Sequence, residues 1–182
     1  MKWLSLALFA SAAVASPVAP RDDLTVYSLK VSSRTAGLDG SYLACNGSTV
    51  GVYQAKQPVK VYTVPSGTGQ KGMYELHTYP VGVVDHALGL VGNNGGLLQL
   101  TDVTMPASTT FPVGTTCDWT SFSLGGSRDP DTEGDTLQYN GAKGKWVAFP
   151  GASGTWKVTW LTGSAIVVQD YIPIDVVLEK SE

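Results

Sequence analysis

Apolar and polar residues alternate in short runs along most of the chain beyond residue 23. Alternation places every second side chain on one face of a β-strand, so each run predicts a strand with one buried face. The clearest runs lie in residues 136–161, TLQYNGAKGKWVAFPGASGTWKVTWL. There Trp156, Val158 and Trp160 share one face, and the residues between them are polar. We therefore expect a meander of strands on an aromatic core.

About a dozen such runs are separated by Gly, Pro, Asn and Ser at intervals of roughly 8 to 12 residues. We expect strands over residues 24–31, 41–45, 49–54, 59–64, 73–78, 87–91, 97–100, 119–124, 137–139, 146–149, 156–160, 165–169 and 171–179. Evenly spaced short strands are typical of a barrel or a sandwich. No helical period follows the first 15 residues, so the pattern predicts an all-β protein.

Three turn signals recur at similar spacing. Leu43, Leu90 and Tyr139 lie roughly 50 residues apart, and each precedes an Asn-Gly or Asn-Asn-Gly turn. Because these turns supply the positive φ that hairpins need, we expect three similar hairpins. Three such units favour a single compact barrel of β-trefoil-like form, with six barrel strands and three hairpins. Asn-Gly turns also recur for local reasons in Gly-rich β-proteins, so a β-sandwich is the alternative.

The first 15 residues, MKWLSLALFASAAVA, have the pattern of a secretory signal peptide. Lys2 precedes an apolar run too short to span a bilayer, and Ala13-Val14-Ala15 is a small-x-small cleavage site. We expect residues 16–22 to be a flexible N-terminal segment and residues 23–180 to form a single β domain. The predicted location is therefore extracellular, with the cell wall as a candidate site.

Charge and composition narrow the range of partners. The chain carries 12 Lys and Arg against 15 Asp and Glu, a net charge of −3, without a basic stripe for nucleic acid. No later stretch approaches the ~20 apolar residues that a membrane span requires. We therefore expect neither nucleic acid nor a membrane as a partner, and we predict no cofactor.

The predicted secretion bears on the two cysteines and on one glycosylation sequon. In an oxidising compartment Cys45 and Cys117 most simply form one disulfide, worth roughly 4 kcal/mol for a loop of this length. A free, buried pair is the alternative. Asn46-Gly47-Ser48 is the only N-glycosylation sequon, and its place at a predicted hairpin tip favours a glycan on Asn46.

An acidic loop is the one candidate for a metal. Asp129, Asp131, Glu133 and Asp135 alternate as at the start of a calcium loop, but position twelve is Asn140 rather than Glu. No helix pattern flanks the loop on either side. We therefore favour a solvated acidic loop and predict no metal site, with these four acids as the calcium candidate.

Catalytic motifs are weak in this sequence. Asp85 and His86 are neighbours, and neighbours in an extended chain point to opposite faces, so they cannot pair as in a hydrolase triad. No G-x-S-x-G motif is present. We therefore predict no enzymatic activity and no catalytic residues.

Aromatic residues supply the candidate ligand-binding positions. Trp119, Trp146 and Tyr139 could stack on sugar rings. In a small β-domain, tryptophan more often fills the core, and that is the alternative for these residues.

Parts of the chain resemble a known group of proteins. The segments LQYNG (137–141), WVAFP (146–150) and GTWKVTW (154–160) resemble the C-terminal half of small secreted fungal cell-wall proteins of the phialide-development type, a group that includes allergens. This sequence has only two cysteines, fewer than that pattern leads us to expect. The resemblance implies a secreted or wall-associated, non-enzymatic fungal protein and supplies no catalytic residues.

Three functions are therefore weighed. We favour a secreted, non-enzymatic protein associated with the cell wall or interacting with a host, whose partner is wall polysaccharide or a host surface molecule. A lectin-like carbohydrate-binding module is the first alternative, supported by the three hairpins and the tryptophans. A secreted hydrolase of unknown type is the second, and it would need carboxylates or a Ser/His pair to converge in a pocket.

Overall fold

The computed structural model describes residues 24–93, 95–125 and 135–181. The predicted signal peptide (1–15) and flexible segment (16–22) lie outside these residues, as do Asp129, Asp131 and Glu133 of the acidic loop. The described chain consists of strands, connecting loops and one short 3-10 turn, Ala152–Gly154. Nothing in this part of the chain forms a helix that could cross a bilayer. The all-β prediction is confirmed.

The strands form one continuous sheet. In chain order they are β1 (Val26–Ser32), β2 (Ala44–Asn46), β3 (Thr49–Val52), β4 (Lys60–Pro65), β5 (Tyr74–Tyr79), β6 (His86–Asn93), β7 (Leu97–Thr104), β8 (Thr115–Asp118), β9 (Phe122–Gly125), β10 (Asp135–Tyr139), β11 (Gly144–Pro150), β12 (Trp156–Thr162), β13 (Ile172–Pro173) and β14 (Asp175–Lys180).

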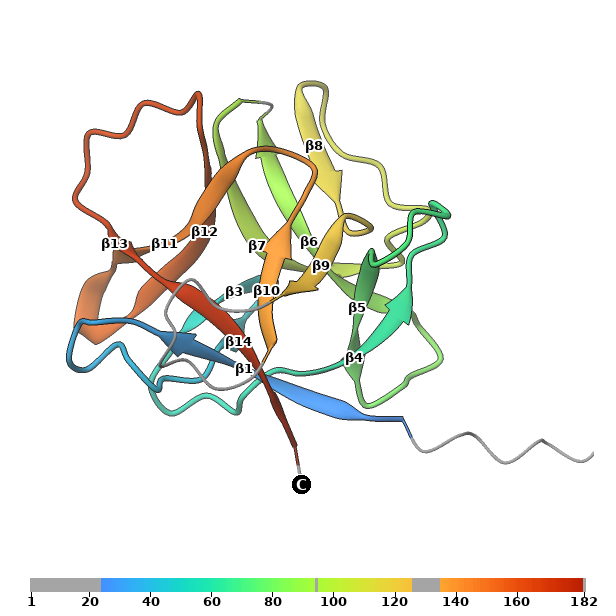
Figure 1. The fold of residues 1–182 in the computed structure, drawn as a ribbon, viewed down its shortest axis with the longest axis horizontal. Coiled ribbons are helices and arrows are strands. Elements are labelled where there is room, and N and C mark those ends of the chain that lie inside the picture. The colour runs from blue at the N-terminus through green and yellow to red at the C-terminus, as the bar shows by residue number, and fades with distance from the viewer. Residues whose placement is uncertain (1–23, 94, 126–134, 182) are drawn as a thin grey trace, which may run out of the picture.

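Six strands close into a barrel, and all of their pairings are antiparallel. β1 pairs with β4 and β14, β4 with β5, β5 with β9, β9 with β10, and β10 with β14. Figure 1 shows β14, β10 and β9 crossing the middle of the view, with β4 and β5 on the right. The prediction of a barrel is confirmed. The choice between a β-trefoil-like fold and a sandwich stays a prediction.

Three hairpins, β2–β3, β6–β7 and β11–β12, lie outside this barrel and pair with one another through β12, β3 and β7. Two of them turn where the sequence predicts, with Gly47 and Gly95 at positive φ. The third predicted turn, Asn140-Gly141, is not a hairpin, because β10 and β11 on either side pair with other strands. The actual third hairpin turns at residues 151–155, where the Gly151 N–H bonds the Thr155 carbonyl at 2.8 Å.

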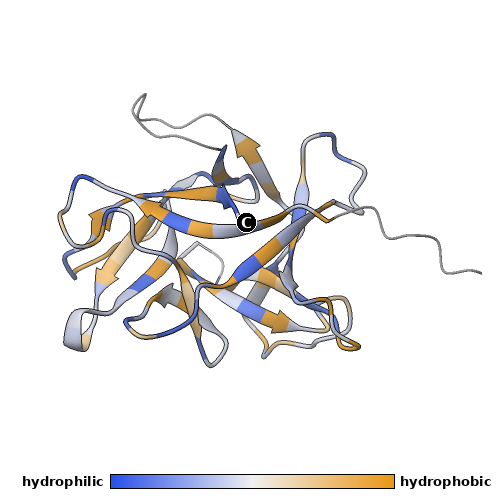
Figure 2. Cartoon of the chain, turned by 90° about the horizontal axis from the view of Figure 1, so that it is seen from below, coloured by the Kyte–Doolittle hydropathy of each residue, from blue (hydrophilic) through white to orange (hydrophobic). Residues whose placement is uncertain are grey.

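The core fills the barrel with aliphatic side chains and with the aromatic residues of β9 to β12. Trp146 and Trp160 meet edge to face with ring centroids 5.2 Å apart, and Tyr139 contacts Trp160 at 5.5 Å. The Trp146 indole N–H donates to the Leu137 carbonyl at 2.6 Å. Figure 2 shows apolar and polar residues alternating along the strands, as the sequence pattern predicts.

A second, smaller core lies on the opposite face of β11 and β12. It consists of Val147, Phe149 and Leu161, and Val167 and Tyr171 pack against it. These last two come from the segment after β12, where the sequence predicts a strand over residues 165–169. That prediction is wrong: the segment forms no strand and pairs with no strand of the described chain.

Candidate functional site

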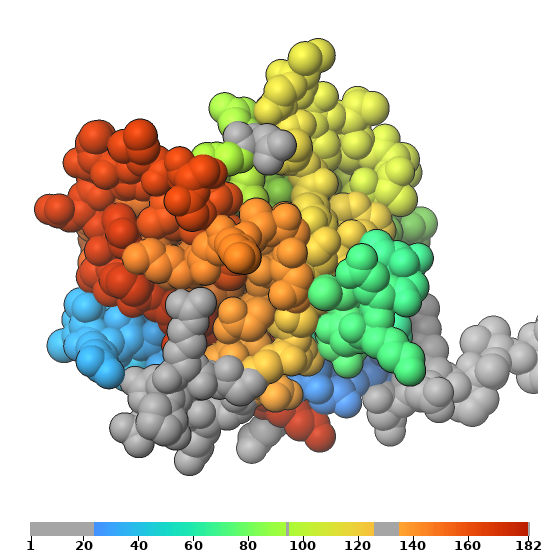
Figure 3. Space-filling view, turned by 45° about the horizontal axis from the view of Figure 1, so that its top comes forward, coloured from blue at the N-terminus to red at the C-terminus, as the bar shows by residue number. Residues whose placement is uncertain are grey.

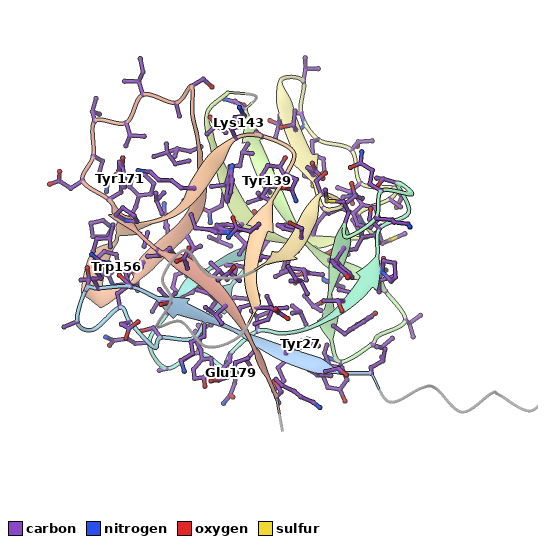
Figure 4. The ribbon with its side chains drawn as sticks, viewed as in Figure 1. Tyr27, Tyr139, Lys143, Trp156, Tyr171 and Glu179 are labelled. Atoms are coloured by element: carbon purple, nitrogen blue, oxygen red, sulfur yellow. The ribbon has the colours of Figure 1, made fainter. Side chains whose placement is uncertain are left out.

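Two of the three predicted ligand-binding residues are buried in the core. Tyr139 and Trp146 are 7% and 2% exposed, so their rings cannot stack on a sugar. Tyr139 lies among the strands in the middle of the fold (Figure 4), and its hydroxyl donates to Asp118 at 3.0 Å. Burial first, and then the Asp118 carboxylate, raise the pKa of Tyr139. Trp119 is half-buried, and of the three only its ring remains partly accessible.

Trp119 belongs to a cluster centred on His77 of β5. His77 Nδ1 lies 2.7 Å from Asp85 Oδ1, and His77 Nε2 lies 3.1 Å from Glu75 Oε2. A ring protonated at both nitrogens donates to both carboxylates in this geometry. The side chains of His77 and Glu75 are only 12% and 10% exposed, whereas that of Asp85 is 51% exposed. A buried imidazole is therefore held between one buried and one accessible carboxylate.

Aromatic rings complete the cluster. Tyr62, opposite His77 on β4, stacks on the imidazole with a centroid distance of 5.6 Å and an interplanar angle of 27°. Trp119 presents its edge to the same imidazole at 6.2 Å. Glu75 is fixed in addition by the Gly67 N–H, which donates to Oε1 at 3.1 Å. Packing and hydrogen bonds thus orient each member of the cluster.

A hollow of about 430 Å³ opens beside these residues. Its polar wall is formed by Tyr62, Thr78, Asp85 and His86, and its apolar wall by residues 80–84. Three valines of that segment are exposed to solvent: Val81, Val83 and Val84. One aromatic side chain, several hydrogen-bonding groups and an apolar rim are typical of a site for a small amphipathic ligand.

The sequence predicts that the neighbours Asp85 and His86 do not pair with each other, and they do not. Asp85 binds His77, whereas His86 Nδ1 lies 3.3 Å from Asp102 Oδ2 on β7. The other Asp102 oxygen is buried without a hydrogen-bond partner among the described residues. Each of the two neighbours therefore has its own partner, on a different strand.

The His77 cluster is not among the sites that the sequence predicts. Its signal is Glu75 and His77 two residues apart on one strand, where the alternating pattern puts both on the face away from Leu76 and the core. A polar pair that shares a strand face and is still buried requires partners from elsewhere in the fold. Those partners, Tyr62, Asp85 and Trp119, could not be identified from spacing alone.

The predicted Cys45–Cys117 disulfide is absent, and both residues are free thiols. Cys45 is on β2 and Cys117 on β8, and the pairing order β2, β3, β7, β6, β8 puts three strands between them. Neighbouring strands are about 4.8 Å apart, so the two Cα atoms lie beyond the ~7 Å that a disulfide allows. The alternative of a free, partly buried pair holds.

Both thiols are expected to react slowly in the folded protein. Burial raises the pKa of Cys45 to about 11, with a smaller contribution from Asp102, and burial with Asp118 raises the pKa of Cys117 to about 11. At pH 8 about 0.1% of each thiol is then ionised, against roughly a quarter at an ordinary pKa. We expect iodoacetamide to alkylate the native protein ~100-fold more slowly than the urea-unfolded protein, as read by intact mass. Two unlabelled cysteines after unfolding would instead indicate a disulfide.

The remaining sequence candidates lie at the surface. Asn46 is exposed at the β2–β3 turn, and a glycan there stays a prediction. Of the calcium candidate, only Asp135 is described; it begins β10 and lies opposite Leu178. Within the described ranges no three His, Cys, Asp or Glu side chains gather as metal ligands do.

Comparison with known proteins places this chain in no group. No family model matches it, and neither a curated protein nor a solved structure does. The resemblance to fungal cell-wall proteins therefore stays a prediction.

Proposed function

We propose that this chain is a secreted, non-enzymatic protein that binds carbohydrate, with cell-wall polysaccharide as its partner, in the hollow beside His77. The observation that carries the proposal is the cluster itself: an oriented aromatic ring and an accessible carboxylate at the mouth of a hollow of about 430 Å³. Sugars present apolar C–H faces and a rim of hydroxyls, and a site of this composition matches both.

Each wall of the hollow has a distinct part in this proposal. The Tyr62 ring and the valines of residues 80–84 offer apolar surface to a sugar ring. Asp85, His86 and Thr78 offer acceptors and donors to its hydroxyls. His77 is a positioning residue, because it holds Asp85 on one side and stacks on Tyr62 on the other.

The same geometry favours binding over catalysis. Both nitrogens of His77 face carboxylates, so neither is directed at a bound substrate. Of the described residues that line the hollow, Thr78 is the one with an aliphatic hydroxyl and Asp85 the one with a carboxylate, and that carboxylate is bound to His77. A non-enzymatic role agrees with the absence of a catalytic motif in the sequence.

We also favour the β-trefoil-like fold over the sandwich. Each of the three hairpins β2–β3, β6–β7 and β11–β12 follows one barrel strand along the chain and precedes the next barrel strand. Two short strands interrupt this order, β8 after the second hairpin and β13 after the third. The hairpins then meet through β3, β7 and β12. This is the layout expected of three similar units around a six-stranded barrel, and a sandwich gives no reason for three hairpins to meet.

Glycan titration tests the proposed function. Soluble oligomers of β-1,3-glucan, chitin and mannan represent a fungal wall, and xylan and galactose-terminated glycans represent a host. We expect one of the wall oligomers to bind with a Kd below about 1 mM by calorimetry, and the host glycans to bind more weakly. Tyr62→Ala and Asp85→Asn should each weaken binding about 10-fold, the value of one stacking or hydrogen-bond contact.

Tyr42→Ala is the matched control, because Tyr42 is an exposed tyrosine outside the hollow. It should bind as the unaltered protein does. Equal affinities for all three variants, or no binding of any glycan at millimolar concentration, would exclude the site. New reducing ends or other products during the titration would contradict the non-enzymatic part of the proposal.

A further inference from the structure

A second hollow lies beside the segment that follows β12. Its volume is about 630 Å³, against about 430 Å³ for the hollow beside His77. Volumes of roughly 300 to 1,000 Å³ are typical of small-molecule sites. Residues of β7, β11 and β12 form its floor, and residues 150–152 and 166–169 form its walls. Val167 also packs against the small core on β11 and β12, which holds its wall in place.

The strand register determines which side chains form the floor. Lys157 and Thr159 are two residues apart on β12, so they share the strand face that lines the hollow. Phe149 lies opposite Lys157 on β11, and Gln99 lies opposite Thr159 on β7. The floor therefore has a polar centre with an aromatic side chain beside it.

The Gln99 amide ties the strands of the floor together. Its Nε2 donates to three backbone carbonyls, those of Val158 at 2.9 Å, Leu100 at 3.2 Å and Val50 at 3.3 Å. These carbonyls belong to β12, β7 and β3, the strands through which the three hairpins meet. The floor is thus fixed before a ligand arrives, which lowers the entropic cost of binding.

Thr159 is the group in the floor that the fold leaves unpaired. The residue is 4% exposed, and its hydroxyl has no hydrogen-bond partner among the described residues. In that part of the chain, Asp102 Oδ1 is the one enclosed side-chain atom without a partner, so the Thr159 hydroxyl keeps some accessible surface. The hollow that Thr159 lines provides this surface. A ligand in the hollow would supply the hydrogen bond that the protein does not.

The charge of the lining favours an anion. Lys157 is exposed, and it is the one charged side chain among the described residues that line the hollow. No carboxylate of the described chain pairs with it. The other polar side chains of the lining, Gln99, Thr159 and Gln169, are neutral, and the remaining lining is apolar apart from Gly151. An anionic head group on an apolar body matches this distribution.

We propose that this hollow binds an apolar carboxylic acid, with a hydrocarbon chain of about eight to ten carbons. The Lys157 ammonium attracts the carboxylate, and the Thr159 hydroxyl donates to one of its oxygens. The chain lies against the Phe149 ring and residues 166–168, which removes apolar surface from water on both sides.

This site lies apart from the hollow beside His77. Of the described residues, none lines both hollows. Figure 1 shows the segment after β12 as the wide loop on the left, with β4 and β5 on the right, and Figure 3 shows that segment in red-orange on the left and the connection from β4 to β5 in green on the right. Binding of the acid is therefore independent of the proposed carbohydrate site.

Three ligands with the same eight-carbon chain test the head group by calorimetry. We expect octanoate to bind with a Kd below about 1 mM. Octanol lacks the charge and should bind at least ~5-fold more weakly, and octyltrimethylammonium carries the opposite charge and should not bind detectably. Decanoate should bind about 15-fold more tightly than octanoate, because two further CH₂ groups are buried.

Two variants test the two polar contacts. Lys157→Met keeps most of the apolar stem and should weaken octanoate binding about 10-fold while leaving octanol binding unchanged. Thr159→Val should weaken octanoate binding about 5-fold. It should not lower the urea midpoint, because the fold makes no hydrogen bond with that hydroxyl. Lys143→Met is the matched control, because Lys143 is an exposed lysine outside the hollow, and it should bind octanoate as the unaltered protein does.

Near-ultraviolet circular dichroism establishes that each variant folds. No octanoate binding at about 5 mM, equal affinities for octanoate and octanol, or an unchanged octanoate affinity in Lys157→Met would each overturn the proposal. An equal loss in Lys143→Met would also overturn it, because the acid would then respond to surface charge in general. Octanoate binding without any glycan binding would reject the proposed function alone.

Discussion

Replacement of Trp146 by alanine is expected to lower the free energy of unfolding by about 4 kcal/mol. The Trp146 ring is 2% exposed and packs edge to face on Trp160. Its removal leaves a cavity in the barrel core, and it also leaves the Leu137 carbonyl without the indole N–H that it accepts at 2.6 Å. The lost contacts and the buried, unsatisfied carbonyl act in the same direction.

Urea denaturation followed by circular dichroism measures this loss. Trp119→Ala is the matched control, because it removes the same side chain from a half-buried position outside the core cluster, and we expect it to cost less than half as much. Trp146→Phe keeps most of the ring volume and should cost about 2 kcal/mol. Similar losses for the alanine variants at positions 146 and 119 would contradict the core packing described here.

Alternation in the sequence predicts the strand content of this fold well. Val158 and Trp160 face the core, as their spacing indicates, and Lys157, which precedes Val158, is exposed. Thr159 is the exception, because it is 4% exposed although its face is predicted to be solvated. Alternation reports the two faces of a strand, and it does not report that a later segment returns to cover the second face.

The errors in strand pairing have a common physical cause. Asn140-Gly141 has the composition of a hairpin turn, but the Asn140 N–H bonds the Ser121 carbonyl and the chain leaves the barrel there. Asn-Gly suits the turn of a two-residue hairpin, and it equally suits the connection from the barrel strand β10 to the hairpin strand β11. Both connections need a compact turn. β8 is missed because its four residues begin at the end of a Thr- and Pro-rich connection and, among the described strands, pair only with β6.

The candidate site is the least predictable part. Glu75 and His77 are adjacent on one strand face, but Asp85 comes from the loop before β6 and Tyr62 from β4. The antiparallel pairing of β4 with β5 and the turn between β5 and β6 bring these residues together. Trp146 and Tyr139 are predicted instead, because the residue type suggests stacking on a sugar and does not report burial.

Replacement of His77 by leucine is expected to lower the free energy of unfolding by about 3 kcal/mol. Leucine fills the space beside Tyr62 but leaves the Glu75 carboxylate, 10% exposed, with the Gly67 N–H as its remaining described partner. A buried carboxylate that loses its partner destabilises the folded state more than an exposed one does. Urea denaturation at pH 7 measures the change.

His86→Leu is the matched control for this variant. His86 also lies against an aspartate, at 3.3 Å from Asp102, but its side chain is 37% exposed. This pair is half-buried and more accessible than the His77 cluster, so we expect a smaller loss, of about 1 kcal/mol. Losses of the same size at His77 and His86 would show that the His77 cluster is no more than a surface ion pair.

The double variant Glu75→Gln/His77→Leu separates the lost partner from the lost packing. A neutral amide at position 75 can still accept the Gly67 N–H, and it removes the buried charge that His77→Leu leaves behind. We therefore expect the double variant to recover about 1 to 2 kcal/mol relative to His77→Leu. Asp85 stays without its imidazole in both variants, so glycan binding should remain weakened even where stability returns. Recovery of stability and affinity together would mean that His77 acts only through the fold, whereas recovery of stability alone identifies it as the residue that positions Asp85 at the hollow.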